Sequence, residues 1–231
     1  MGFANFVESN TSEYVLKYLS NFTTVNSVFD SITPNISSTV FSDTIAVYTT
    51  TANNAKSDLE KYLGFLRYVG SLQFQSMTAP NLKGLPLRGA ITKGEFYSNN
   101  KDILFGKAWV EAFYLEREKA ISPRVIVKKE ANDYNSALTV DINIPSNNRG
   151  APLRQDNDGE LHCNYLNSIL DAESKLSQHS FSFIANHKNS IEKNLEKTKN
   201  ISNVNEKYIW LRDYHNWFCS GYKQLEVYQI I

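Results

Sequence analysis

The sequence predicts a single α+β domain, in which helices flank a mixed or antiparallel sheet and a helical segment ends the chain. Two observations predict this fold class: helical and strand patterns alternate as far as about residue 150, and the last third is mostly helical. The length of 231 residues fits one large domain or at most two small ones. We expect a first part over 1–150 and a mainly helical extension over 151–231, packed on the same domain.

The first half of the chain begins with a helix. Apolar residues at helical spacing predict that it ends near Ser20. The β-branched run 39–48 follows, and it is either one strand or two strands around a tight turn at Ser42-Asp43. A second helix is expected over 53–75.

The second helix is followed mainly by strands. They are predicted over 85–92, 103–105, 123–127 and 138–144. We expect the first two of these strands to pair as a hairpin before Gly106. A third helix runs from Gly106 to about Ala120, and helices dominate 164–222.

Composition and charge argue against several classes of protein. The 24 Lys and Arg residues balance 24 Asp and Glu residues, whereas a protein that coats DNA or RNA usually carries a basic excess. No apolar run approaches the roughly 20 residues of a membrane-spanning helix, and the first residues lack the pattern of a signal peptide. We therefore expect a cytoplasmic protein that binds neither nucleic acid nor membrane. Cys163 and Cys219 form no CxxC pair, which predicts neither a disulfide framework nor a zinc site.

Histidines and aromatic residues give weak signals when they are taken alone. His162, His179, His187 and His215 show no specific metal-ligand spacing, and we interpret them as solvated or hydrogen-bonded surface residues. A second group falls on one helical face, namely Trp210, Tyr214 and Trp217. Packing against a core is the favoured interpretation of these rings, and base stacking in an RNA-binding domain is the weaker alternative.

Asp43 is the strongest candidate for chemistry in the first half of the chain. If 39–48 is one strand, Asp43 shares a face with Ile45 and Val47, where an unpaired carboxylate is costly to bury. A turn at Ser42-Asp43 avoids that cost. Either geometry presents a carboxylate on a rigid element, which suits a metal ligand. A turn aspartate without chemistry is the alternative, and this segment alone favours it.

Five segments of the chain form a recognisable pattern when they are considered together. In chain order they are Phe41-Ser42-Asp43, 87–94, 105–116, 123–127 and 208–216. Their order and spacing resemble those of class III nucleotidyl cyclases, and above all the pyrimidine (uridylate or cytidylate) cyclases of the Pycsar anti-phage system. The resemblance covers nearly the whole chain and implies a cyclase-like catalytic domain over 1–150.

The resemblance also implies a reaction. Class III cyclases use two carboxylates to hold two Mn²⁺ or Mg²⁺ ions per active site, and these ions activate the ribose 3′-hydroxyl for attack on the α-phosphate with release of pyrophosphate. Asp43 matches the second carboxylate, and the first metal aspartate is expected just before Met1. Gly2 and Phe3 match the turn that cradles the substrate phosphates. The family further implies a homodimer with active sites between subunits and a downstream effector that responds to the cyclic nucleotide.

The positions that select the base depart from the purine pattern. Thr39 stands where purine-specific relatives carry a lysine, and Ile103 stands where they carry a base-reading aspartate. Val110 and Tyr114 replace the transition-state asparagine and arginine of those relatives. A tyrosine at the position of Tyr114 belongs to the Pycsar pattern, so Asp43 and Tyr114 are the expected catalytic residues.

Two basic residues complete the predicted site. Arg88 and Lys93 are candidates for contacts with phosphate or base, and exposed charges at strand ends are an equally favoured alternative. The expected activity is the conversion of UTP into cyclic UMP in anti-phage defence. One alternative is a cytidylate cyclase that makes cyclic CMP from CTP. Another is an inactive cyclase-like protein that binds nucleotide or a partner, which Val110 supports.

Overall fold

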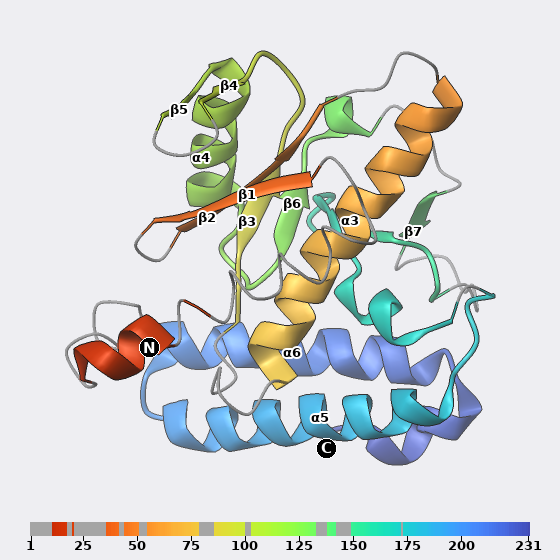
Figure 1. Ribbon diagram of the computed structural model, residues 1–231. Helices are drawn as coiled ribbons and strands as arrows, with labels where there is room; N and C mark the ends of the chain where they lie inside the picture. Colours follow the sequence, from red (N-terminus) through yellow and green to blue (C-terminus); the bar gives the residue numbers. More distant parts are fainter. Residues whose placement is uncertain are drawn as a thin grey trace. The chain divides into compact units, whose positions relative to one another are not determined.

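A computed structural model gives the structure of the chain. It describes residues 11–17, 20, 36–41, 44–50, 55–78, 86–99, 103–132, 138–141, 149–171 and 173–231. These residues form a mixed α+β fold, as the sequence predicts (Figure 1). The chain divides into two compact units, Met1–Leu72 and Gln73–Ile231.

The first unit contains a β-hairpin. Strands β1 (Ile36–Phe41) and β2 (Thr44–Thr49) pair antiparallel, and their register ends at the facing pair Phe41 and Thr44. The prediction of two strands is therefore confirmed over the single long strand. Ser42 and Asp43 connect the strands in sequence and lie outside the described residues.

Two helices of the first half agree with the sequence analysis. Residues 12–17 are helical, within the range expected for the first helix. Helix α3 spans Ala55–Thr78, close to the predicted 53–75. Its last turns belong to the second unit, where Phe74 and Met77 join the apolar core.

The second unit is built on a mixed five-stranded sheet. The strands are, in spatial order, β3 (Gly89–Ile91), β6 (Val125–Val127), β9 (Leu161–Cys163), β8 (Leu153–Gln155) and β7 (Thr139–Asp141). The two outer pairs are parallel and the two inner pairs antiparallel. Strands β8 and β9 come from the segment 151–231, so that segment contributes strands to the sheet as well as helices.

The predicted hairpin between 85–92 and 103–105 is wrong. Strand β5 (Leu104–Phe105) pairs with β4 (Tyr97–Ser98), and β3 pairs in parallel with β6. The physical reason is that the chain passes through α4 (Lys107–Lys119) between β3 and β6, which makes a β-α-β crossover. The strand at 103–105 therefore pairs with β4, its neighbour along the chain, and not with β3.

Gly106 fixes the start of α4, where the sequence predicts it. Its φ angle is +139°, a conformation that side chains other than glycine rarely adopt. A Cβ atom at this position would also collide with the carbonyl oxygen of Glu95. That same carbonyl accepts a hydrogen bond from the Ala108 N–H at 3.2 Å, so the hairpin β4–β5 and the first turn of α4 are held together.

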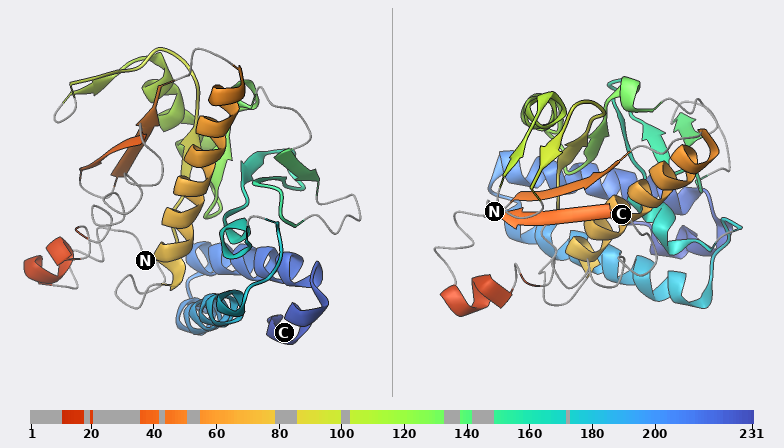
Figure 2. Two further views of the ribbon diagram at one scale, coloured as in Figure 1. Left: turned by 45° about the vertical axis from the view of Figure 1, so that its right-hand side comes forward. Right: turned by 45° about the horizontal axis from the view of Figure 1, so that its top comes forward.

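Helices α5 (Gln178–Thr198) and α6 (Ser202–Ser220) lie side by side and supply much of the core of the second unit (Figures 1 and 2). Two 3₁₀ segments, η3 (Tyr165–Ile169) and η4 (Lys223–Tyr228), pack with them. Tyr214 is buried in this core, and Trp210 and Trp217 are partly buried against it. The packing interpretation of these three rings is therefore confirmed.

Candidate functional site

The residues predicted for the cyclase site are divided among different parts of the chain. Gly2, Phe3 and Asp43 lie outside the described residues. Thr39 lies in β1 of the first unit, half-buried and opposite Ala46. The remaining predicted site residues, Arg88, Lys93 and Tyr114, belong to the second unit.

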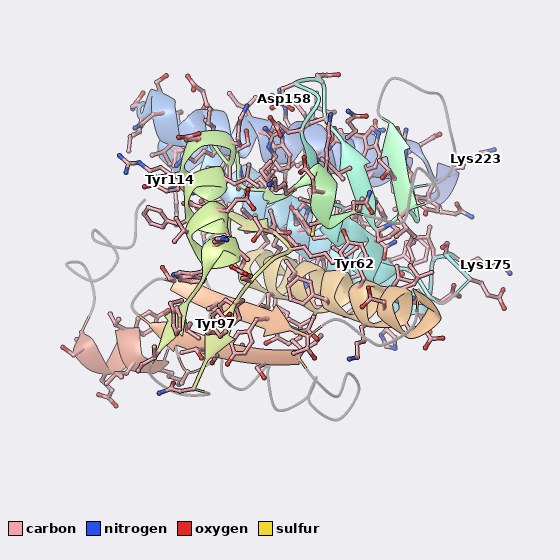
Figure 3. All side chains as sticks on the ribbon, turned by 90° about the horizontal axis from the view of Figure 1, so that it is seen from above. Tyr62, Tyr97, Tyr114, Asp158, Lys175 and Lys223 are labelled. Atoms are coloured by element: carbon pink, nitrogen blue, oxygen red, sulfur yellow. The ribbon has the colours of Figure 1, made fainter. Side chains whose placement is uncertain are left out.

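Tyr114 lies on an exposed apolar side of α4. The spacing i, i+3, i+4, i+7 puts four residues on this side, which we call the outer face of α4: Val110, Phe113, Tyr114 and Arg117. The first three expose 52%, 57% and 54% of their surface. Figure 3 shows Tyr114 projecting from α4 away from the sheet. Exposed apolar groups gathered on one helix face make this face a candidate contact surface.

The neighbouring hairpin adds to this apolar surface. The rings of Tyr97 and Phe105 stack with their centroids 5.0 Å apart, and both remain more than half exposed. Ile103, at the predicted base-reading position, is equally exposed. The hairpin β4–β5 and the outer face of α4 therefore present large apolar side chains to solvent.

Arg88 is held against a different side of α4. Its Nε lies 2.5 Å from Oε1 of Glu116. Because Glu116 follows Tyr114 by two positions, the two side chains leave the helix roughly 200° apart. The structure therefore brings Arg88 to α4 but not to Tyr114. Lys93 lies exposed just after β3.

The sequence analysis missed a group of ionisable residues in the second unit, all of them buried except Asp158. We call Arg124, Arg154, Asp156, Asp158 and His162 the arginine–aspartate cluster. Asp156 accepts hydrogen bonds from Arg124 Nη1 at 2.8 Å and from Arg154 Nη2 at 3.1 Å. Asp158, at the turn between β8 and β9 (Figure 3), accepts a second bond from Arg124 Nη1 at 3.1 Å.

Strand register explains why these groups meet on one face of the sheet. Arg154 in β8 faces His162 in β9, and His162 in turn faces Ile126 in β6. Residues two apart on a strand share a face, so Asp156 joins Arg154 and Arg124 joins Ile126. The spacing of Arg154 and Asp156 was the available sequence signal, but it needed the strand β8 to be recognised first.

Burial and neighbouring charges shift the pKa values of Asp156 and His162 in the cluster. Burial raises the pKa of Asp156, but Arg154 and its other partners outweigh this effect and hold that pKa below its ordinary value. Burial, reinforced by the positive charge of Arg154, lowers the pKa of His162 to about 3. His162 is therefore neutral, and its Nδ1–H donates to the Cys163 carbonyl at 3.0 Å.

An aromatic ladder on α6 covers this side of the sheet. Trp210, Tyr214 and Trp217 stack with centroid separations of 5.4 Å and 5.9 Å. Trp210 Nε1–H donates to Asp156 at 3.0 Å, which links the ladder to the cluster. The Cζ of Arg154 lies 4.4 Å from the Trp217 ring centroid, and the Cζ of Arg149 lies 4.3 Å from the same centroid. Both guanidinium groups therefore make cation–π contacts with one indole.

The interpretation of the histidines as surface residues is correct for His179 and wrong for the other three. His162, His187 and His215 are completely buried, because helix packing and sheet pairing enclose them. His187 and His215 approach each other through their Nδ1 atoms at 2.9 Å.

The two buried histidines belong to a hydrogen-bonded chain that we call the histidine chain. The Nε2–H of His215 donates to the Tyr228 carbonyl at 3.0 Å, so its Nδ1 is free to accept. His187 Nδ1–H donates to that atom, and its Nε2 accepts from the Tyr165 hydroxyl at 2.8 Å. Burial lowers the pKa of His215 to about 4 and lowers that of His187 well below its ordinary value. Both histidines are neutral, and each link has one donor and one acceptor.

Comparison of the chain with protein-family models, with curated proteins and with solved structures finds no match. Within the described ranges, His, Cys, Asp and Glu side chains form no group of three or more that could hold a metal ion. Cys163 and Cys219 are buried free thiols. None of the helices in the described part is long and apolar enough to cross a membrane.

Proposed function

We propose that the chain is a pyrimidine nucleotide cyclase that converts UTP into cyclic UMP and pyrophosphate with Mn²⁺ or Mg²⁺. In this proposal it generates the signal of an anti-phage defence system. The carrying observation is the ordered set of cyclase-like segments together with the β1–β2 hairpin. The hairpin register ends at Phe41 and Thr44, so the predicted metal carboxylate, Asp43, belongs to the two-residue connection between paired strands.

The metal ions would stabilise the attacking ribose oxygen and the leaving pyrophosphate. Asp43 suits this role because Mg²⁺ and Mn²⁺ prefer carboxylate oxygens. Tyr114 offers a hydroxyl that can donate a hydrogen bond to a phosphate oxygen or to the base. Arg88 and Lys93 would contribute positive charge near the start and the end of β3.

The apolar side chains of α4 and the hairpin support the proposed homodimer. Val110, Phe113 and Tyr114 form an exposed stripe on the helix, and Tyr97 and Phe105 extend the apolar surface on the hairpin. A second copy of the chain would remove these groups from water. Tyr114 would then lie at the subunit interface, where the family resemblance places the active site.

The direct test is to incubate the purified chain with each of the four ribonucleoside triphosphates and Mn²⁺ and to identify the products. We expect cyclic UMP, and we expect Asp43→Asn to abolish it. Tyr114→Phe should lower the rate with little effect on folding. Asp213→Asn changes an exposed carboxylate of α6 and is the matched control. Cyclic CMP as the main product would move the assignment to a cytidylate cyclase, and cyclic AMP or cyclic GMP would contradict the proposed base.

Val110 favours a second candidate, an inactive cyclase-like protein that binds nucleotide or a partner. This aliphatic side chain stands exposed on α4 at the position of the family's transition-state asparagine, and it cannot donate a hydrogen bond. Saturable binding of UTP without any product, in the presence of Mn²⁺, would support this candidate. Product formation that depends on Asp43 would exclude it.

A further inference from the structure

The surroundings of Trp217 contain more hydrogen-bond donors than acceptors. Five buried side-chain nitrogen atoms there have no hydrogen-bond partner in the part of the chain that the structure describes. They are Nε and Nη1 of Arg149, Nε and Nη1 of Arg154, and Nε1 of Trp217. Native proteins pair almost all of their buried polar groups, so such a concentration calls for a partner.

Arg154 is the more deeply buried of the two arginines. Its side chain is only 4% exposed, and among the described residues it has one acidic partner, Asp156. Asp156 also accepts from Arg124 and from Trp210, so its negative charge is shared. Asp158 pairs with Arg124 but not with Arg154, so Arg154 depends on a single carboxylate that two other donors also use.

Arg149 adds a second positive charge to the same place. No ion pair joins it to an acidic residue within the described ranges, and its Nη2 reaches only the Ser220 hydroxyl, at 3.5 Å. Burial lowers the pKa of Arg149, and the neighbouring positive charge of Arg154 lowers it further. Asp156 is paired with Arg154 but not with Arg149, so an added anion beside Arg149 would relieve the repulsion between the two guanidinium groups.

We propose that Arg149, Arg154 and the indole N–H of Trp217 form a binding site for a phosphate oxyanion. A phosphate group presents at least three acceptor oxygens, whereas a carboxylate presents two, so phosphate better matches two guanidinium groups and an indole N–H. Inorganic phosphate and the phosphates of a nucleotide share this chemistry. The site uses none of the residues assigned to the cyclase reaction, so it stands or falls separately from that proposal.

Arg149 lies on the accessible side of the site. Arg149 is half-buried and Ser220 is exposed, whereas Arg154 is almost fully buried. The stem of Arg149 rests on the backbone of Gly221, where an added Cβ would collide with Arg149 Cγ. The φ angle of Gly221 is −78°, which any residue can adopt. Gly221→Ala would therefore displace Arg149 without removing its charge or straining the backbone.

The test is a titration of the full chain with inorganic phosphate, pyrophosphate or UTP, without divalent metal and at constant ionic strength set by chloride. Tryptophan emission and the thermal unfolding midpoint report binding, because Trp217 belongs to the site. We expect a saturable change with at least one of these anions. Arg149→Met and Gly221→Ala should each weaken it by about ten- to a hundred-fold, which corresponds to the loss of one charged hydrogen bond. Arg212→Met removes a cation elsewhere on α6 and should leave the affinity unchanged.

Comparing the responses to the three anions distinguishes a nucleotide ligand from a free oxyanion. A response to UTP that exceeds the response to inorganic phosphate, is lost in Arg149→Met and is kept in Asp43→Asn would identify a nucleotide site outside the cyclase centre. A response to inorganic phosphate or pyrophosphate alone would identify a free oxyanion. The proposal is overturned if no anion gives a saturable change, or if Arg149→Met and Gly221→Ala bind as tightly as the unaltered chain. Because no metal is present, these results do not depend on turnover.

Discussion

The two buried polar networks of the second unit differ in how far their buried donors and acceptors are paired with one another. In the histidine chain, Tyr165, His187 and His215 pass neutral hydrogen bonds from one group to the next and end on a backbone carbonyl. Around Trp217, the donors of Arg149 and Arg154 exceed the acceptors that the described residues supply. Neutral groups can satisfy one another completely, whereas surplus charge requires a counter-ion from elsewhere. The first network therefore serves stability, and the second is a candidate for binding.

Helix α6 carries members of both networks. His215 and Trp217 are two positions apart, so their side chains leave the helix in roughly opposite directions. His215 meets His187 of α5, while Trp217 meets Arg154 of β8. Helix α6 therefore contributes His215 to the neutral histidine chain on one side and Trp217 to the charged group around Arg149 and Arg154 on the other.

The largest expected effect comes from Asp156→Ala. This change removes the carboxylate that Arg124, Arg154 and Trp210 share. Removing one partner of a buried ion pair leaves an uncompensated charge, and we expect a loss of about 3–5 kcal/mol in the free energy of unfolding. Urea denaturation followed by circular dichroism measures it. The same change at exposed Asp213 should cost less than about 0.5 kcal/mol. Equal effects at both positions would show that Asp156 does not hold the cluster together.

Acid should weaken the histidine chain, and buried His162 should add to the same loss because its folded pKa of about 3 also lies below the ordinary value of 6.5. The folded pKa of His215 is about 4 and the ordinary value is 6.5, so the unfolded chain binds the proton first. Stability is therefore full above pH 6.5 and falls as the pH drops toward 4, by about 1.4 kcal/mol per pH unit for each such histidine. Asp156 has a lowered pKa, so its contribution is lost only at more acidic pH.

The measurement is the urea midpoint as a function of pH. His187→Gln should reduce the slope between pH 6.5 and 4 because it removes one of the titrating groups. His179→Gln, at an exposed position, should leave that slope unchanged. A stability profile that stays flat across this range would mean that the folded and unfolded chains take up protons equally, so that folding does not lower the pKa values of the histidines.

Tyr165→Phe should have a smaller effect, and it tests whether the histidine chain is closed. The change removes the hydroxyl that donates to His187 Nε2 at 2.8 Å and leaves that nitrogen unpaired in the core. A buried acceptor without a partner costs about 1–3 kcal/mol, which urea denaturation can resolve. Tyr222→Phe, at a partly buried tyrosine of the same core, is the matched control. A change of less than a few tenths of a kcal/mol in the free energy of unfolding of Tyr165→Phe would contradict the proposed order of donors and acceptors in the histidine chain.

Sequence periodicity predicted elements that depend mainly on residues close together in the chain. Helical periodicity predicted the length of α3 and the start of α4 at Gly106, whereas the run 39–48 left one strand and the hairpin β1–β2 as alternatives. Pairing of β3 with β6 was missed because it depends on a crossover rather than on sequence proximity.

The charged cluster was missed for a related reason. Strands β8 and β9 have three residues each, too few for a period-two pattern to stand out. The meeting of His187 with His215, and of Arg149 with Trp217, depends on the packing of elements far apart in the chain. No spacing within one element encodes such contacts. Of the predicted cyclase residues, the tertiary structure adds most for Tyr114, whose exposed position the sequence alone did not give.

The smallest expected effect, that of Arg149→Met, gives the sharpest contrast between the networks. Methionine keeps an unbranched stem against Trp217 while removing a partly buried charge that has no acidic partner within the described residues. Lost cation–π attraction of about 0.5–1 kcal/mol is offset by relief of charge repulsion and of unpaired donors, so stability without phosphate should change by less than about 1 kcal/mol. Urea denaturation with and without phosphate at constant ionic strength measures the change. Phosphate should then raise the stability of the unaltered chain more than that of Arg149→Met. A loss of about 3 kcal/mol without phosphate would instead mean that Arg149 is already satisfied within the protein, as the histidine chain is, and the contrast between the two networks would disappear.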